Sequence, residues 1–525
     1  MPSIYHGELV KQKIATVSPV LFVMDDGRRN GYDAPMSNEN LQAIEGLAPE
    51  NIWRRFAELS SIPRCSKQEG QVREWLLRVA REAGLDHTTD ATGNVLIRKE
   101  GSGPPANTPA VALQAHIDMV CEKNRGTEHD FAEDPIRLVV DGEWVRADRT
   151  TLGADNGIAV AMMVALLAGE YEHPPLECLF TVDEESGLTG ALKLDPNLLT
   201  AKKLINIDSE EEGHFCIGCA GGRNSHGSLP ITTNPVSGKS FRFFVSGLRG
   251  GHSGINIGEG RGNSVELGGR ALYDLFRKQS ELLLVSVKGG DKHNAIPREF
   301  EAQLLLPDSA APGAEDTLRS WVDRWRTLFA EELGDIEGGL TLSLEPLSEG
   351  AASAMDRETS DRVVRLLAAL PHGVLVMSRA VEGLVETSTN LAAVRLEAGA
   401  LKILTSQRSS LATGVDDAAR RVRAPIELAG GSVSEAEGYP AWPPNPDSRL
   451  LADAVRAYRT VTEEDPIVEA VHAGLECGVI GDKYPGMEMI SFGPDIEGAH
   501  TPEERVRTAS VERSWRFLLQ LLREV

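Results

Sequence analysis

Apolar segments of two lengths alternate along the first part of the chain. Residues 93–98, 111–116, 176–182 and 203–207 are apolar runs of strand length, whereas residues 158–169 form a longer, almost wholly apolar run. The short runs are typical of buried strands and the long run of a buried helix. Strands that alternate with helices indicate right-handed crossovers and parallel pairing. We therefore predict an α/β fold with a central mixed, largely parallel sheet flanked by helices.

The pattern changes after the glycine-rich residues 219–222. Strand-length runs at 241–247, 282–288, 300–306, 340–344, 392–396 and 401–405 are interspersed with helical periodicity at 262–278, 316–333 and 416–429. This mixture predicts an inserted α+β domain. The proline-rich segment 442–446 has the composition of a return linker, and a strand at 487–492 resumes the first pattern. We predict an extension of unknown role at 1–45, an α/β domain formed by 46–229 and 441–525, and the insertion at 230–440.

Ionisable side chains follow the predicted strands, at the same end of each. They are His116, Glu184, Glu185 and Asp208, and Asp155 stands at the start of the predicted buried helix. Parallel sheets bind ligands at the carboxyl ends of their strands, so we expect these side chains to meet at one sheet edge. Each acid alone could cap a turn or a helix. Four acids together beside a histidine would repel one another without a cation, so the pattern favours a metal site.

His116 and Asp118 are one residue apart at the end of a predicted strand. In extended backbone such residues point to the same side, so Asp118 can accept the ring N–H of His116. A carboxylate in that position holds a metal-binding histidine in one tautomer. The alternative is an ordinary loop that happens to contain both residues, so other segments must supply the missing ligands.

His500 lies just before a predicted helix start. Thr501 is a typical cap, Pro502 suits the first helical position, and Glu504 completes a capping box. A histidine at this point can face a site at the strand ends. We therefore add His500 to the candidate ligands.

Composition and charge exclude several classes of partner. The 525 residues include 41% hydrophobic and 25% charged residues, which is ordinary for a globular protein, and no apolar run is long enough to cross a bilayer. The net charge of −24 disfavours nucleic acid and anionic membranes. Six cysteines are too few for a disulfide scaffold and fit a reducing compartment, so we expect a cytoplasmic protein. Cys216 and Cys219 have the spacing of a redox or a zinc site, but neither a second cysteine pair nor a His-x-x-x-His accompanies them.

Six motifs follow one another along the chain. They are His116-Ile-Asp118, Gly153-Ala-Asp155-Asn-Gly, Asp183-Glu-Glu-Ser-Gly187, Asn206-Ile-Asp208, Gly250-Gly-His252-Ser-Gly254 and Ala499-His500-Thr-Pro502. In this order they resemble the aminoacyl-histidine dipeptidase (Xaa-His dipeptidase, carnosinase-like) branch of the co-catalytic zinc metallopeptidases. The resemblance runs from about residue 48 to the end and takes in residues 293–298, 407–410 and 472–477. Cys121, close after Asp118, departs from the pattern and is a soft potential ligand near the metals. We expect it either to support the ligands without binding metal or to be incidental.

The resemblance implies two zinc ions, with Mn²⁺ or Co²⁺ as substitutes. It implies that Asp155 bridges the two ions, that His116 and Asp208 complete one site, and that Glu185 and His500 complete the other. One carboxylate can bridge two metals about 3.5–4 Å apart, and such a pair activates a water. Imidazole and carboxylate ligands with few thiolates suit these metals.

The resemblance also implies roles in catalysis and substrate binding. Glu184 would be the general base, Asp118 would orient His116, and His252 would polarise the scissile carbonyl. The glycines around His252 equally fit a tight turn. Asn294 and Arg408 would hold the substrate, with Arg408 binding its terminal carboxylate as a bidentate fork.

The expected function is metal-dependent hydrolysis of short peptides, most simply Xaa-His or carnosine-like dipeptides, by a zinc-peptidase catalytic domain with an α+β lid. The small peptide is the expected substrate and a homodimer the expected assembly. The alternatives are a related amidohydrolase, such as an N-acyl amino acid deacylase or a carboxypeptidase, and a non-catalytic binding protein on the same scaffold.

Overall fold

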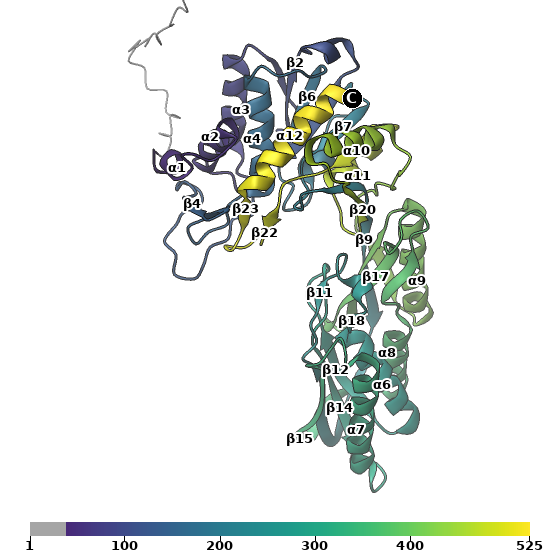
Figure 1. The fold of residues 1–525 in the computed structure, drawn as a ribbon. Coiled ribbons are helices and arrows are strands. Elements are labelled where there is room, and N and C mark those ends of the chain that lie inside the picture. The colour runs from purple at the N-terminus through teal and green to yellow at the C-terminus, as the bar shows by residue number, and fades with distance from the viewer. Residues whose placement is uncertain (1–37) are drawn as a thin grey trace, which may run out of the picture. The chain divides into compact units, whose positions relative to one another are not determined.

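The computed structural model describes residues 38–525 (Figure 1). Most of the predicted extension at 1–45 lies outside the described residues, and its last part forms helix α1 (Asn38–Ala43). The side-chain amide of Asn40 donates to the Ile136 carbonyl, and its oxygen accepts the Leu138 N–H, each at 2.9 Å. This end of the extension therefore packs at strand β4 (Leu138–Asp141). Within the described part, no helix combines the length and the apolar character needed to cross a membrane.

The first sheet has eight strands in mixed directions. Their order is β1 (Asp86–Thr89), β2 (Val95–Lys99), β6 (Leu176–Thr181), β3 (Val111–His116), β7 (Lys203–Asn206), β21 (Glu488–Ser491), β8 (His214–Cys219) and β20 (Ile467–Val471). The four central strands β6, β3, β7 and β21 pair in parallel with one another, and β8 pairs in parallel with β20. The pairs β1–β2, β2–β6 and β21–β8 are antiparallel. The predicted α/β fold with a mixed, largely parallel central sheet is confirmed.

Both faces of this sheet are buried, which explains the continuous apolar runs in its strands. On β3, Val111, Leu113 and Ala115 join the larger core cluster, and Ala112 points into the cluster on the opposite face. Helices α2 (Glu50–Ser60), α3 (Gly70–Glu82), α4 (Ala154–Ala168), α10 (Arg449–Thr462) and α12 (Thr508–Glu524) cover the first face, and α5 (Thr189–Leu192) and α11 (Glu476–Lys483) cover the second (Figure 1). Every residue of α4 from Asn156 to Leu167 is buried, as its composition predicts.

The second sheet is antiparallel and carries helices of its own. It runs β15 (Thr341–Met355), β10 (Thr233–Ser246), β14 (Phe300–Pro307), β12 (Leu283–Gly289), β17 (Val385–Glu397), β18 (Ala400–Ser409), β9 (Gly221–Pro230) and β19 (Ser432–Glu435), and β16 (Gly373–Met377) pairs with β17. Helices α6 (Ser264–Lys278), α7 (Ala314–Leu333), α8 (Arg357–Ala369) and α9 (Ala412–Leu428) share its core cluster. Strand β9 already belongs to this sheet, although we placed it before the insertion. The domain boundaries stay a prediction.

Two smaller sheets complete the fold. One pairs β11 (Gly251–His252) with β13 (Ala295–Ile296), and the other joins β22 (Ile496–Glu497), β23 (Arg505–Arg507), β5 (Trp144–Ala147) and β4. The second of these ties the segment after His500 to the segment before Asp155, because Val506 pairs with Val145.

His372 gives the fold a dependence on pH that can be measured. Its Nδ1 accepts the Asn263 side-chain N–H at 3.1 Å, and burial lowers the pKa of the ring to about 4. The unfolded chain, with an ordinary histidine pKa, binds this proton more readily, so stability is present above pH 6.5 and lost as the pH falls towards 4. At pH 5.5 the free energy of unfolding should be about 1.4 kcal/mol lower than at high pH because of this one group. His372→Asn keeps an acceptor but cannot titrate. Between pH 7 and 5.5 its Tm should therefore fall less than the Tm of the wild-type protein. Equal changes would contradict this assignment.

Candidate metal centre

Three parallel neighbours in the first sheet bring the predicted ionisable residues to one edge. His116 is the last residue of β3, Asp208 lies just beyond β7, and the loop with Glu184 and Glu185 follows β6. Strands β6 and β7 flank β3, and His116 stands opposite Thr181 of β6. The carboxyl ends of the three strands therefore lie side by side, which is where α/β sheets bind their ligands.

The Asp155 carboxylate lies between two histidines. Its Oδ1 is 3.2 Å from Nε2 of His116, and its Oδ2 is 3.2 Å from Nε2 of His500. Asp208 Oδ1 is 3.4 Å from the same atom of His116, and Glu185 Oε2 is 3.0 Å from that of His500. The ligand atoms thus form two groups that share Asp155, each with its atoms within 4.8 Å of one another. This is an arrangement in which one carboxylate can bridge two cations.

The charges of this cluster fit bound metal. Burial alone would lower the pKa of His116, but Asp208 and other nearby carboxylates outweigh burial and raise it well above its usual value. Hydrogen bonds to Asp155 and Glu185 raise the pKa of His500 to about 11. Among the described residues, Oε1 of Glu185 is one of the buried oxygens without a hydrogen-bond partner. Divalent cations would take the place of the protons on both rings, and imidazole and carboxylate donors suit zinc.

Asp118 contacts two sides of the cluster. Its Oδ1 is 3.4 Å from Nδ1 of His116 and accepts the backbone N–H of Glu184 at 3.0 Å. Its Oδ2 accepts the backbone N–H of Glu185 at 3.2 Å and the hydroxyl of Ser66 at 2.8 Å. Burial would raise the pKa of Asp118, but His116 and these donors outweigh burial and lower it. Asp118 can therefore orient both the histidine and the loop after β6, and the sequence indicated only the first contact.

Glu184 faces the same centre. One of its carboxylate oxygens lies within 4.8 Å of ligand atoms of His116 and Glu185. Burial, with Asp208 and Glu476 adding to it, raises the pKa of Glu184 well above its usual value. Cations beside it would favour the ionised form. A buried carboxylate at this position can accept a proton from a water held in the centre.

Two buried residues that shape the site were not predicted. The Asn156 side chain donates to Oδ1 of Asp208 at 2.5 Å. The Arg64 guanidinium donates to the carbonyls of Ile117 and Asp118 at 3.1 and 2.9 Å, and so fixes the chain just beyond β3. Asn156 belongs to one of the glycine-flanked motifs, which is a signal for its importance. Nothing in the sequence around Arg64 marks it.

The helix start predicted at 501–504 is wrong. These residues form a turn, β23 follows, and α12 begins only at Thr508. Glu504 does not cap a helix of its own segment. It accepts backbone N–H groups from Leu152, Gly153, Ala154 and Asp155, at the start of α4. A glutamate with capping-box spacing can satisfy any unpaired N–H groups within reach, and the sequence does not say which.

Cys121 is not incidental, because it forms a disulfide with Cys65. The segments of the two residues already lie together, since Cys65 forms a backbone bridge with Met119. The count of cysteines could not reveal this pair, because only the fold brings the two segments side by side. Cys216 and Cys219 are free, and burial raises the pKa of their thiols to about 12 and about 11. Such thiols stay protonated, so they are poor nucleophiles.

The predicted substrate residues form a group of their own. His252 pairs with Ala295 in the β11–β13 ladder, and the N–H of the next residue, Ser253, donates to the Asn294 carbonyl at 2.9 Å. Arg408, on β18, donates to the Tyr439 hydroxyl at 2.7 Å, and a Cβ at Gly254 would come within 3.3 Å of its Nε. His252 and Arg408 belong to none of the metal-ligand groups found in residues 38–525.

His472, which the sequence analysis did not assign a role, joins this substrate group. Its Nε2 lies 2.7 Å from the Ser388 hydroxyl. Burial lowers the pKa of His472 to about 3 and that of His252 to about 4, and Arg408 adds to both effects. Both rings are therefore neutral at pH 7 and can hydrogen-bond a carbonyl or a carboxylate of a ligand.

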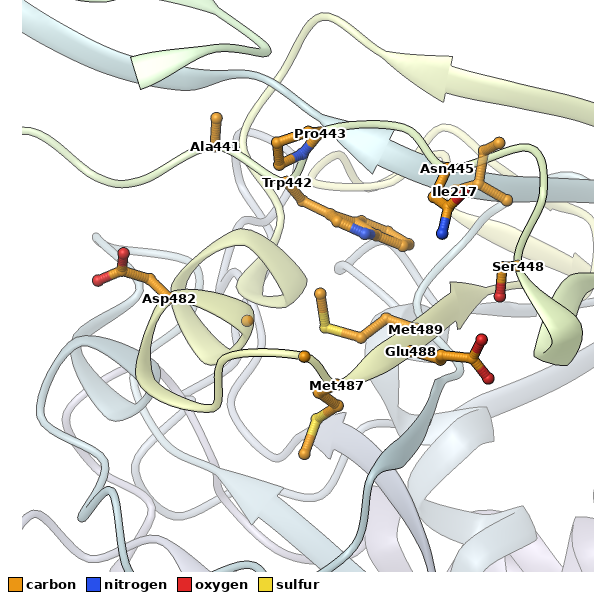
Figure 2. Close-up of a pocket in the computed structure, with 12 residues that line it drawn as sticks. Ile217, Ala441, Trp442, Pro443, Asn445, Ser448, Asp482, Met487, Glu488 and Met489 are labelled. Carbon is orange, nitrogen blue, oxygen red and sulfur yellow. The ribbon is translucent and has the colours of Figure 1, made fainter. Parts of the chain in front are cut away.

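A pocket of about 520 Å³ is lined by a different set of residues (Figure 2). Trp442, Met487 and Met489 line it together with Ile217. It contains none of the residues predicted for catalysis, metal binding or substrate binding. Size alone therefore does not locate the chemistry, which follows the histidines and carboxylates at the sheet edge.

Paired histidine–carboxylate groups at the edge of an α/β sheet, with a further glutamate facing them, define a metal-dependent hydrolase. The chain belongs to peptidase family M20/M25/M40, which matches residues 112–524. Members of this family depend on metal ions, so the chain is a metallopeptidase, as the sequence predicted.

Individual relatives agree with this assignment. The chain is 38% identical over 488 residues to the cytosol non-specific dipeptidase of Escherichia coli (strain K12), covering 92% of this chain and 99% of that protein. It is also 38% identical to the crystal structure of aminoacylhistidine dipeptidase from Vibrio alginolyticus, with a TM-score of 0.85 over 92% of this chain and 98% of that chain. The predicted resemblance is confirmed. The aminopeptidase PepT from Bacillus cereus ATCC 10987 shares the fold, with a TM-score of 0.52 at 16% identity over 91% of this chain and 99% of that chain.

Proposed function

We propose that this protein is a dipeptidase that hydrolyses Xaa-His and carnosine-like dipeptides and tolerates a broad range of side chains. The observation that carries the proposal is the Asp155 carboxylate, whose two oxygens each face one histidine while Glu184 faces the same centre. The similarity to two dipeptidases over nearly the whole chain supports the substrate class.

The proposed cofactor is a pair of zinc ions, for which Mn²⁺ or Co²⁺ can substitute. His116, Asp155 and Asp208 would hold one ion, and Asp155, Glu185 and His500 the other. When bound, the pair would supply Lewis acidity and lower the pKa of a water between the two ions. Glu184 would accept a proton from the water that attacks the peptide carbonyl, and would pass it to the amine that leaves as the C–N bond breaks. Asp118 keeps His116 in the tautomer that presents Nε2 to the metal.

The substrate would be held by the group around Arg408. Arg408 binds the terminal carboxylate of the dipeptide, Asn294 holds its backbone, and neutral His252 donates to the scissile carbonyl. A requirement for a free carboxylate so close to the cleaved bond would restrict cleavage to the last peptide bond of a chain, which in a dipeptide is its one peptide bond. His472 is placed to assist, because its ring lies beside Arg408 and Ser388.

Arg408→Lys tests the role in substrate binding. Lysine keeps the charge but loses the planar fork, so KM for dipeptides should rise about 10–100-fold with kcat changed much less. Arg395→Lys on the neighbouring strand β17, where Arg395 pairs with Glu397 at the surface, is the matched control and should leave KM unchanged. An unchanged KM in Arg408→Lys would remove Arg408 from the substrate site.

A panel of substrates tests the reaction itself. The protein should hydrolyse Xaa-His dipeptides faster than N-acyl amino acids, lose activity in a chelator, and regain it with Zn²⁺, Mn²⁺ or Co²⁺. Preference for N-acyl amino acids would instead favour a deacylase with the same ligands. Metal binding with no hydrolysis of either class would favour a binding protein.

We also propose a cytoplasmic homodimer. The cytosolic location is supported by the name of the Escherichia coli relative. The dimer rests on the resemblance to related enzymes, and light scattering of the purified protein measures it directly.

A further inference from the structure

Four backbone N–H groups converge on the carboxylate of Glu504. Oε2 accepts from Leu152 at 2.7 Å and Gly153 at 2.9 Å, and Oε1 accepts from Ala154 at 2.7 Å and Asp155 at 3.3 Å. The residue is 2% exposed, so water does not compete for these groups. Successive N–H groups that point into one concavity form an anion site, and here the anion is a side chain of the same protein.

These N–H groups belong to the turn that carries Asp155. Gly153 takes the left-handed conformation, with φ of 69°, and a Cβ at this position would lie 2.4 Å from the Arg64 guanidinium. Arg64 binds the other side of the turn, because its Nη2 donates to the Gly153 carbonyl at 2.5 Å. Burial lowers the pKa of Arg64 to about 10, so it remains a cation at pH 7 and balances Glu504. One buried ion on each side thus holds the turn.

Glu504 also belongs to the turn that carries His500. Within this turn the Thr501 N–H donates to the Gly498 carbonyl and the Glu504 N–H donates to the Thr501 carbonyl, each at 3.1 Å. Glu504, which accepts the N–H groups of the Asp155 turn, is therefore linked to His500 by a short hydrogen-bonded loop. Between these two turns, Nε2 of His500 lies 3.2 Å from Oδ2 of Asp155.

We infer that Glu504 is a positioning residue for the metal centre, one that fixes Asp155 and His500 relative to each other. This inference rests on the proposed roles of these two residues as metal ligands. Without the carboxylate, four N–H dipoles would face one another in a buried space, and the turn would open to satisfy them elsewhere. Opening the turn moves Asp155 away from His500. The ion that both residues and Glu185 would hold should suffer most.

Glu504→Gln tests the inference, because it replaces one acceptor oxygen with an amide that faces two N–H donors. Glu177→Gln is the matched control. Glu177 lies on β6 of the first sheet and is 3% exposed. It accepts the backbone N–H groups of Thr200 and Ala201 at 2.8 and 3.0 Å. Both variants replace a buried carboxylate that accepts backbone N–H groups with an amide. At Glu177 both backbone N–H groups bond to Oε2, so the amide oxygen can keep them, and Glu177→Gln controls for the loss of a buried charge outside the proposed ligand sets. Only Glu504→Gln should alter the metal centre.

The experiment measures the binding of Co²⁺ to the full-length, metal-free protein. Calorimetry gives the affinity, and the visible absorption of the bound ion reports its coordination. We expect affinity for one of two Co²⁺ ions to fall about 10–100-fold in Glu504→Gln, with an altered spectrum, and to stay within about 3-fold in Glu177→Gln. Wild-type affinity and spectrum in folded Glu504→Gln would overturn the inference. Fewer than two ions in wild type would overturn the proposed function instead.

Glu504→Asp keeps both acceptor oxygens on a shorter side chain and decides the matter if Glu504→Gln does not fold. Its affinity for one of two Co²⁺ ions should fall below that of wild type. Full wild-type affinity with an unchanged spectrum would show that the turn tolerates movement of the carboxylate, and would overturn the inference.

Discussion

Glu184→Gln should lower kcat for dipeptide hydrolysis about 10³-fold and leave the bound metal in place. The amide has the size of the carboxylate but cannot accept a proton from water, and general-base catalysis is worth about 10²–10⁴-fold. Because Glu184 faces the centre without belonging to either proposed ligand set, the metal content should not change. Steady-state kinetics and elemental analysis of the same preparation measure both quantities.

Retention of more than a tenth of the wild-type kcat in Glu184→Gln would refute the proposed base. Loss of one metal ion would instead make Glu184 a ligand, since its carboxylate lies within 4.8 Å of ligand atoms of His116 and Glu185. Glu211→Gln is a suitable control, because the Glu211 side chain is 72% exposed and pairs only weakly with His214. It should keep full activity.

Asp155→Asn should weaken both metal sites and abolish activity. The substitution removes one of the two anionic oxygens that face His116 and His500, and both proposed ligand sets contain Asp155. The affinity for each ion should fall by more than about 100-fold, because even residues that merely orient a ligand contribute about 10–100-fold. Calorimetric titration of the metal-free variant with Zn²⁺ measures the loss.

Glu210→Gln is the control for Asp155→Asn. Burial and the nearby Asp155 raise the pKa of Glu210 to about 7, so this acid senses the cluster, but it belongs to neither proposed ligand set. Its removal should leave Zn²⁺ affinity within about 3-fold of wild type. A loss confined to one ion in Asp155→Asn would mean that Asp155 does not bridge.

The sequence predicted the edge of the first sheet well, because parallel strands impose a simple rule. His116, Glu184 and Asp208 each follow an apolar run, and parallel pairing of β3, β6 and β7 places their carboxyl ends together whatever the intervening chain does. The contact of His500 with Asp155 follows from motif order rather than from any local pattern.

The residues that were missed act across long distances in sequence. Glu504 has the spacing of a local cap, yet its partners are 349 to 352 residues away. Arg64 donates to backbone carbonyls just beyond β3. Every residue has a backbone carbonyl, so the sequence gives no sign of which ones a side chain will contact. Side chains that bond to distant backbone cannot be predicted from periodicity.

The second sheet was predicted less completely, and its edge explains why. Strand β15 reaches from Thr341 to Met355, whereas the apolar pattern predicted only 340–344. It is an edge strand that pairs with β10 alone, so much of it needs no apolar alternation. Helix α8 beside this sheet was also missed, as was helix α10 over the first sheet, although Asp356 and Ser448 cap them with side-chain hydrogen bonds.

The distance along the chain between Asp155 and His500 has a consequence for biosynthesis. Asp155 leaves the ribosome 345 residues before His500. At translation rates of about 5–20 residues per second, the nascent polypeptide carries its first carboxylates for roughly 20–70 s before the final imidazole arrives. Binding of the proposed metal pair would therefore come at the end of synthesis, and a polypeptide that ends before His500 would lack one of the proposed ligands.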